Sequence, residues 1–195
     1  MRLTSISKGV MLLAGAMALG GCVKLDGQIN GGGTMNSLGG KGKAVFTVNA
    51  KRCDGQLSGH VNFQDKTAID YEDIGGVSFK ANVIGAGLCG SELVGSALDA
   101  EDPSTACQQL CEPGFFEVNF DYTSTNPNAP GEGRGFVCML DTGEGANRAY
   151  DINGMVRALI IQSGPYHTYW NQGSVSGNLN AKECGGPADD EETNG

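Results

Sequence analysis

Residues 115–122 read FFEVNFDY, and this stretch decides the fold. Apolar and polar side chains alternate along it, with Phe116, Val118, Phe120 and Tyr122 on one side and Glu117, Asn119 and Asp121 on the other. Successive side chains of a β-strand point to opposite faces of a sheet, so a period of two predicts a strand. One face of this strand is expected to be buried and the other to meet solvent.

The same alternation recurs along the chain. Residues 43–50 (KAVFTVNA) and 57–64 (LSGHVNFQ) alternate on either side of Asp54-Gly55, which predicts a hairpin. Glycine-rich turns, including one at 85–90, separate further expected strands at 67–71, 77–84, 92–98, 135–140, 150–152, 155–162 and 174–180. The pattern predicts an all-β fold, either an antiparallel β-sandwich or a barrel-like sandwich of about nine or ten short strands.

One interruption of the strands is expected in the middle of the chain. Asp102-Pro103 has the pattern of an N-cap followed by proline at the first helical position, and Pro113-Gly114 would end a helix. We therefore expect one short helical turn near residues 103–111, which places Cys107 and Cys111 one turn apart.

The N-terminus has the three zones of an export signal. Arg2 and Lys8 are basic, and residues 10–19 (VMLLAGAMAL) form an apolar run that is too short to span a bilayer as a helix. Leu19-Gly20-Gly21-Cys22 follows, and this tetrapeptide resembles the lipobox of bacterial lipoproteins. The alternative is an ordinary secretory signal that happens to contain a cysteine.

The lipobox resemblance has consequences for Cys22 and for the location of the protein. It implies that the signal is removed before Cys22, which then carries thioether-linked diacylglycerol and often an N-acyl chain such as palmitate. Val23, and not aspartate, follows the cysteine. By resemblance to enteric lipoproteins, this implies the outer membrane of a Gram-negative bacterium, with the membrane as partner through the lipid.

Four segments are expected. Residues 1–21 are the signal peptide, 22–42 a lipidated, flexible, glycine-rich tether, and 43–182 the β domain. Residues 183–195 are expected to be a disordered acidic tail, because Asp189-Asp190-Glu191-Glu192 repel one another.

The charge balance excludes one class of partner. The chain has 13 basic and 22 acidic residues, and removal of Arg2 and Lys8 leaves 11 against 22, a net charge near −11. Such an acidic chain does not favour contact with phosphate backbones, so we expect no nucleic-acid partner.

The chain has seven cysteines, and Cys22 is assigned to the lipobox. The other six are disulfide candidates in an exported protein: Cys53, Cys89, Cys107, Cys111, Cys138 and Cys184. Six cysteines allow fifteen pairings, so their connectivity stays open. The C-x-x-x-C spacing of Cys107 and Cys111 lacks the second pair of ligands that a zinc site requires.

A second resemblance covers most of residues 30–180. Short glycine-rich pieces resemble, in order, a β domain of bacterial surface proteins known as the post-COAP domain. The pieces are 31–34 (GGGT), 42–46 (GKAVF), 59–65 (GHVNFQD), 116–122, 130–133 (PGEG), and Tyr169 with Gly173, Val175, Gly177 and Asn178. The insert around Cys107 and Cys111, the extra cysteines and the loop 126–129 depart from that family. The resemblance implies an extracytoplasmic β domain and carries over no activity and no functional residues.

The residues of catalytic and metal chemistry form weak patterns. No G-x-S-x-G elbow accompanies His60 or His167, so a serine-hydrolase triad is not supported. The carboxylates Asp65, Glu72, Glu117 and Asp121 are candidates for glycoside hydrolysis only as carboxylates, because outward acidic residues are expected for solubility alone.

Two groups of residues are candidate binding sites. Asp141, Glu144 and Asn147 place oxygen ligands in a glycine-rich turn, so Ca²⁺ is the cofactor to consider, against the alternative of a solvated hairpin turn. Tyr166, Tyr169 and Trp170 would suit carbohydrate or protein contact if exposed, and would cap the core if buried.

Together these observations predict a lipid-anchored cell-envelope β domain with a binding or structural role and no catalytic activity. Its partner would be an unknown protein or glycan. One alternative is a barrel-like carrier of a small apolar ligand, with a cavity lined by Phe46, Phe63, Phe79 and Phe120. Another is an envelope hydrolase without a recognisable motif.

Overall fold

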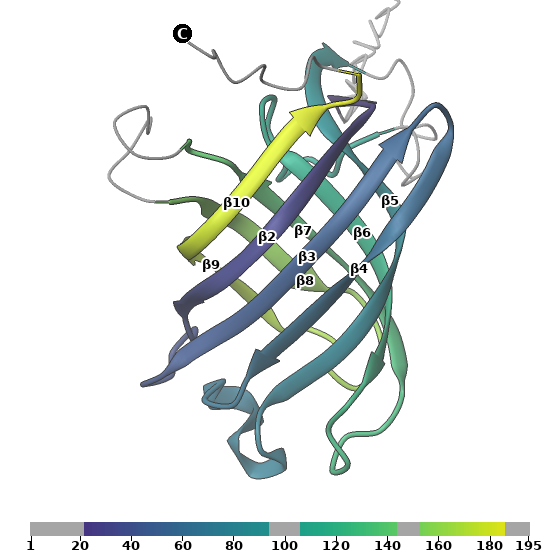
Figure 1. Cartoon of the computed structure of the whole chain (residues 1–195). Coiled ribbons are helices and arrows are strands. Elements are labelled where there is room, and N and C mark those ends of the chain that lie inside the picture. The colour runs from purple at the N-terminus through teal and green to yellow at the C-terminus, as the bar shows by residue number, and fades with distance from the viewer. Residues whose placement is uncertain (1–21, 94–105, 144–152, 186–195) are drawn as a thin grey trace, which may run out of the picture.

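The computed structural model describes residues 22–93, 106–143 and 153–185. Within these ranges, ten strands form one antiparallel sheet that is nearly closed like a barrel (Figure 1). The strands are β1 (Cys22–Leu25), β2 (Gly27–Asn36), β3 (Lys43–Cys53), β4 (Gln56–Asp65), β5 (Val77–Leu93), β6 (Phe116–Ser124), β7 (Glu132–Leu140), β8 (Met155–Ile161), β9 (Trp170–Ser174) and β10 (Ser176–Glu183). A 3-10 helix, η1 (Ile69–Ile74), lies between β4 and β5. The predicted all-β fold class is confirmed.

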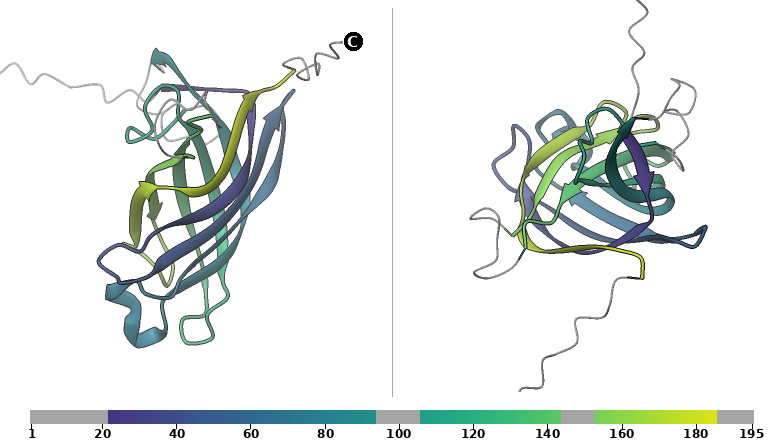
Figure 2. Two further views of the ribbon diagram at one scale, coloured as in Figure 1. Left: turned by 60° about the vertical axis from the view of Figure 1, so that its left-hand side comes forward. Right: turned by 90° about the horizontal axis from the view of Figure 1, so that it is seen from above.

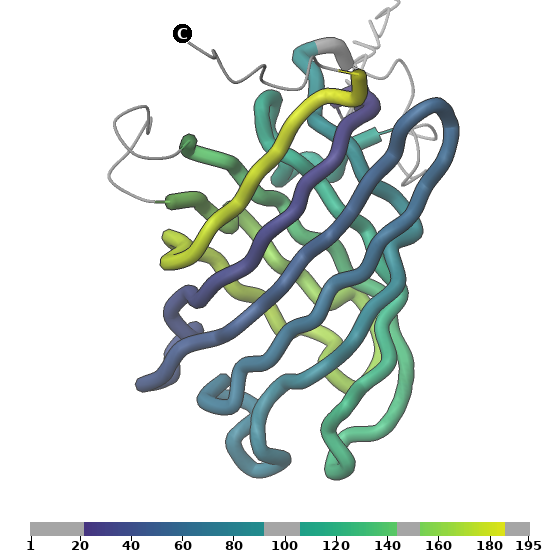
Figure 3. Tube along the Cα trace, in the orientation of Figure 1, coloured from purple at the N-terminus to yellow at the C-terminus, as the bar shows by residue number. Residues whose placement is uncertain are grey.

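The sheet follows the order β10-β2-β3-β4-β5-β6-β7-β8-β9, and β1 pairs with the last part of β5. The predicted hairpin around Asp54-Gly55 joins β3 and β4, where Cys53 pairs with Gln56. Strands β2 to β4 lie in front of strands β6 to β8 and cross them, as Figure 3 shows. In this part of the chain, no helix is long and apolar enough to cross a membrane.

The barrel is closed by one stretch of chain that changes partners. β9 pairs with β8 and β10 pairs with β2, and Val175 alone separates the two strands (Figure 2). A side chain also links β9 to β2, because Asn171 Nδ2 donates to the carbonyl of Asn36 on β2 at 3.1 Å. The Val175 N–H donates to the carbonyl of Gly154 at 2.8 Å.

Aromatic rings fill the inside of the barrel. Phe46, Phe63 and Phe79 are register partners on β3, β4 and β5. Ring centroids lie 5.3 Å apart for Phe63 and Phe79, and 5.5 Å apart for Phe79 and Phe120. All four rings are buried. Cross-strand aromatic contacts of this kind stabilise a sheet through both burial and ring geometry.

The predicted flexible tether over residues 22–42 is wrong. Most of these residues form β1 and β2, and every residue of β2 has a register partner on β3. The glycines that indicated flexibility instead allow backbones to approach closely. A Cβ at Gly31, where φ is +145°, would lie 2.0 Å from the carbonyl oxygen of Asn178 on β10.

Three local predictions also differ from the structure. Residues 67–71 do not form a strand, since η1 begins at Ile69. β5 does not turn at 85–90 but continues to Leu93, with a bulge between Val83 and Gly85. Residues 106–111 hold no helix, only a turn in which the Cys111 N–H donates to the Gln108 carbonyl at 2.8 Å.

Some predictions fall on residues outside the described ranges. These are the signal peptide 1–21, residues 103–105 of the helical turn, residues 94–98 of the strand expected at 92–98, the strand expected at 150–152, and residues 186–195 of the acidic tail. The first residues of that tail are ordered, because Glu183 ends β10 and Cys184 is in a disulfide.

All six disulfide candidates are paired, as Cys53–Cys184, Cys89–Cys107 and Cys111–Cys138. The first pair joins the end of β3 to the residue after β10, which fixes the closing strand. The other two fasten the segment 106–115 to β5 and β7. Cys22 is the free cysteine of the chain.

A buried ion pair lies beneath that segment. Lys24 Nζ is 2.9 Å from Glu117 Oε1, and both side chains are completely buried. Asn119 Nδ2 donates to the same oxygen at 2.6 Å, and the backbone N–H of Gln108 donates to Glu117 Oε2. Gly87 leaves room for the lysine stem, because a Cβ there would lie 2.3 Å from Lys24 Cγ. The expected solvated position of Glu117 is therefore wrong, since β1 and the 106–115 segment cover it.

We expect the Lys24→Met variant to lose roughly 3–5 kcal/mol of unfolding free energy, because the carboxylate of Glu117 would stay buried without its cation. The double variant Lys24→Met/Glu117→Gln should recover part of this loss, since the neutral amide oxygen still accepts from Asn119 while the amide nitrogen faces the Gln108 N–H. Urea unfolding at neutral pH measures both. A double variant no more stable than Lys24→Met alone would contradict the role of the ion pair.

Candidate functional site

The three candidate binding aromatics occupy different environments. Tyr166 and Tyr169 are buried, as the core-capping alternative predicts, whereas Trp170 is 47% exposed on β9. The Tyr166 ring stacks on Tyr122, with centroids 5.8 Å apart, and its hydroxyl lies 2.7 Å from Ser124 Oγ. Of the three, Trp170 alone has an exposed ring.

Tyr169 belongs to a buried polar network around Asp65. Its hydroxyl donates to Asp65 Oδ2 at 2.8 Å, and Ser37 Oγ donates to the same oxygen at 2.8 Å. Asn171 Nδ2 donates to the Tyr169 hydroxyl oxygen at 3.2 Å. Burial, and then the charge of Asp65, raise the pKa of Tyr169 far above its ordinary value. This network holds β4 against the strand that closes the barrel.

The candidate Ca²⁺ turn is only partly described. Asp141 Oδ1 accepts from the Gly143 N–H at 2.8 Å, and Oδ2 accepts from the Ala181 N–H of β10 at 2.9 Å. Asp141 therefore joins the end of β7 to the closing strand. Glu144 and Asn147 lie outside the described residues, so Ca²⁺ binding stays a prediction.

The four carboxylates considered for glycoside hydrolysis do not share a cleft. Asp65 and Glu117 are buried in separate hydrogen-bond networks, Asp121 is paired with Arg134, and Glu72 is exposed on η1. His60 and His167 are both exposed.

Among the described residues, few groups of side chains could hold a metal ion. Two groups of such side chains come close enough to share an ion, and each consists of Glu117 with two cysteines. Those cysteines are joined to each other as Cys89–Cys107 and Cys111–Cys138, so they offer no thiolates.

The outer wall of the barrel carries two polar rows, which run across the strands from β10 to β7. The first row consists of Asn180, Asn30, Asn49, His60, Asn82, Asp121 and Arg134, which are successive register partners. The second consists of Asn178, Gly32, Thr47, Asn62, Lys80, Thr123 and Glu132. Strand alternation predicted several of these residues to face outward, but only the register of the whole sheet aligns them.

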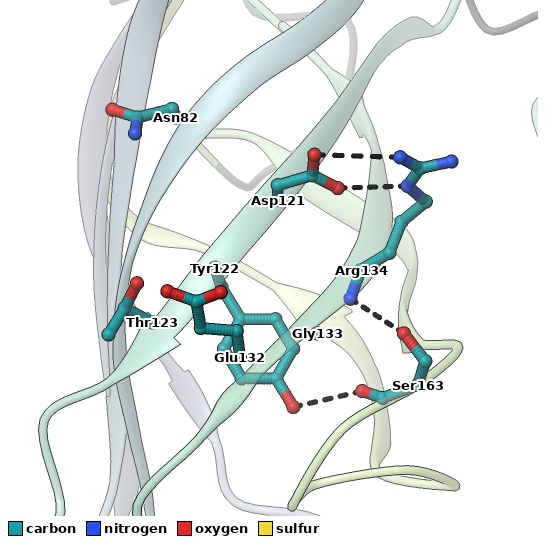
Figure 4. A pocket seen from close by; sticks show the side chains of 8 residues that line it. All are labelled: Asn82, Asp121, Tyr122, Thr123, Glu132, Gly133, Arg134 and Ser163. Carbon is teal, nitrogen blue, oxygen red and sulfur yellow. Dashed lines mark hydrogen bonds and ion pairs between the residues drawn. The ribbon is translucent and has the colours of Figure 1, made fainter.

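Two hollows lie on this wall. The first, of about 500 Å³, is lined by Asn82, Asp121, Thr123, Glu132, Arg134 and Ser163 among others (Figure 4). The second, of about 460 Å³, extends over β3 to β5. Thr47, Asn62, Gln64, Ser78 and Lys80 contribute polar groups to it, and Val45, Phe46, Phe63 and Phe79 make the larger, apolar part of its lining. Lys80 and Asn82 are alternate residues of β5 on one face, so we call the two hollows together the polar trough.

An ion pair and a glycine shape the first hollow. Arg134 Nε donates to Asp121 Oδ1 at 2.8 Å, and this bond and the nearby charge raise the pKa of Arg134. The Arg134 backbone N–H donates to Ser163 Oγ at 2.9 Å, and the Tyr122 hydroxyl donates to the Ser163 carbonyl (Figure 4). A Cβ at Gly133 would lie 2.2 Å from that carbonyl oxygen, so only glycine fits there.

The fold and these surfaces define a disulfide-bonded, antiparallel, barrel-like domain with a filled aromatic interior and a polar outer wall. No family model matches the chain, and neither a curated protein nor a solved structure matches it.

We expect the Tyr169→Phe variant to lose about 1–3 kcal/mol of stability at neutral pH, because buried Asp65 would lose a hydrogen-bond donor. The unfolding free energy of the variant should also fall less in alkaline solution. Unfolded chains release the tyrosine proton near pH 10, whereas the folded protein keeps it to higher pH, so the unfolding free energy falls as the pH rises above about 10. Urea unfolding between pH 7 and 11 should show a shallower fall in Tyr169→Phe. An equally steep fall in both proteins would contradict this.

Proposed function

We propose that this protein is a non-catalytic binding protein of the bacterial cell envelope, attached by lipid at Cys22 to the outer membrane of a Gram-negative bacterium. One observation carries the proposal. All seven cysteines lie in the described ranges, six of them are joined in three disulfides, and the one left free is the lipobox cysteine. Disulfides form and persist in oxidising compartments, which is where lipoproteins reside.

The geometry at Cys22 suits an anchor. Cys22 is the first residue of β1 and is partly exposed, while its carbonyl accepts from the Cys107 N–H at 2.8 Å. Acyl chains on Cys22 would therefore join the membrane directly to the folded barrel. Each buried methylene contributes about 0.8 kcal/mol, so two or three chains hold a protein firmly.

The polar trough is the surface that we assign to ligand binding, and a glycan is the class of ligand it fits best. Asparagine and glutamine amides both donate and accept hydrogen bonds, as vicinal sugar hydroxyls require. The charges of Asp121 and Arg134 neutralise each other, so this pair favours neither a cationic nor an anionic ligand. An apolar-ligand carrier is less favoured, because the rings of Phe63, Phe79 and Phe120 pack against one another inside the barrel.

Intact mass of the protein purified from its native membrane tests the anchor. We expect a chain that begins at Cys22, carries added acyl chains and has six thiols protected from alkylation until reduction. The Cys22→Ser variant should lack the acyl mass and leave the membrane fraction. An uncleaved or unlipidated chain with free thiols would contradict the proposal.

Affinity electrophoresis in gels that contain dextran, xylan or soluble starch tests the trough. We expect one of these neutral polymers to retard the protein, and the Asn82→Ala/Thr123→Val variant to bind it roughly 30-fold more weakly, because two hydrogen bonds are lost. The matched control Asn30→Ala/Asn180→Ala changes the same polar row outside the trough and should bind normally. No retardation, or equal loss in both variants, would contradict the assignment.

A further inference from the structure

A second apolar cluster lies apart from the barrel core. It contains the disulfides Cys89–Cys107 and Cys111–Cys138 with Phe115, Phe136 and Ala158. Phe136 and Cys138 alternate on β7 with Val137 and Met139, and the core cluster includes Val137 and Met139. The second cluster is therefore on the outer side of the wall, beneath the 106–115 segment.

Two hollows open on the margin of this cluster, and they share Arg157 and Gln172. Their volumes are about 600 and 190 Å³. We call them together the apolar slot, because Leu110, Leu140, Met155, Ile160 and Trp170 line it. Glu112, Arg157, Gln172 and Ser174 add polar groups to the larger hollow. Leu110 is 45% exposed and Trp170 47% exposed, which is unusual for two large apolar side chains that line one hollow.

Cys22 belongs to the same surface. Its side chain packs against the second cluster, as do Leu140, Met155 and Ile160. Cys22 has no free length of chain between it and the barrel, because β1 begins there and its carbonyl is bonded to Cys107. Any lipid on Cys22 must therefore bring the bilayer next to this part of the wall.

We propose that the apolar slot rests on the bilayer surface, with Trp170 and Leu110 in the interfacial region. This inference depends on the lipid anchor proposed above. Tryptophan suits the interface because its ring is apolar and its N–H needs a polar partner. Arg157, which is 3.8 Å from Glu112 in a half-exposed pair, places a cation where lipid phosphates lie.

This orientation turns the opposite wall away from the membrane. β3 lies across the barrel from β8, five places along the sheet (Figure 1). The hollow over β3 to β5 would then face away from the bilayer and remain open to a ligand.

Trp170 is the only tryptophan of the chain, so the native protein reports on its own orientation. The lipidated protein is placed in phosphatidylcholine vesicles with or without bromine on the acyl chains, and tryptophan fluorescence is measured. We expect a roughly twofold loss of fluorescence with brominated lipid, because an interfacial ring lies within about 10 Å of the acyl boundary. We also expect vesicles to protect Trp170 from iodide in the water.

A matched variant moves the tryptophan to the opposite wall. Trp170→Phe/Val45→Trp places the ring on β3 at a position that is also 47% exposed. Brominated lipid should not quench its fluorescence, whereas iodide in the water should. The proposal is overturned if Trp170 is unaffected by bromine, or if both proteins are quenched equally.

The failure of the anchor is distinguishable from the failure of this orientation. Without lipid on Cys22, the protein would show no acyl mass and would not float with the vesicles. A lipidated protein that floats, but whose Trp170 stays open to iodide, would overturn the orientation alone.

Discussion

The sheet can close only because one stretch of chain, from Trp170 to Glu183, pairs with β8 at first and with β2 afterwards. A sheet with two free edges exposes unpaired backbone groups that attract other strands. Here each half of the stretch covers one edge, and side chains complete the seam: Asn171 binds the Asn36 carbonyl and Asp141 binds the Ala181 N–H. The aromatic interior, the disulfide at Cys184 and the separation of inner from outer faces all depend on this closure.

Closure divides the surface into walls of different chemistry. Side chains alternate in each strand, so the inward set forms the aromatic core while the outward set is free to vary with position around the barrel. On β10 to β7 that outward set is mainly amide, hydroxyl and balanced charge, with exposed Val45 and Leu57 among them. On β7 to β9 it is apolar and partly covered by the 106–115 segment. One barrel thus has two outer surfaces of different chemistry.

Local patterns in the sequence predicted the strands and their inward faces, because alternation at Phe46, Phe63 and Phe120 is a property of a single strand. These local patterns gave wrong predictions where contacts between distant segments determine a residue's environment. The glycines of β2 led to the prediction of a tether, because the backbone that approaches Gly31 belongs to residues 178–179, far along the chain. Glu117 read as solvated because its cover, Lys24 and Gln108, comes from other parts of the chain. The alignment of polar residues into rows needed the register of seven strands, which no single segment contains.

The pairing of Cys53 with Cys184 spans 131 residues and encloses both other disulfides. Among the six paired cysteines, a chain that crosses a membrane from its N-terminus exposes Cys53 first and Cys89 next, long before Cys184. An oxidant that joins cysteines in order of emergence would therefore produce Cys53–Cys89, which blocks both native partners. The native bond requires either that the barrel assemble before Cys53 is oxidised or that an isomerase exchange the early bond. In an exported chain, correct pairing would thus depend on early assembly of the barrel or on thiol exchange, because the native partner of Cys53 follows the last strand.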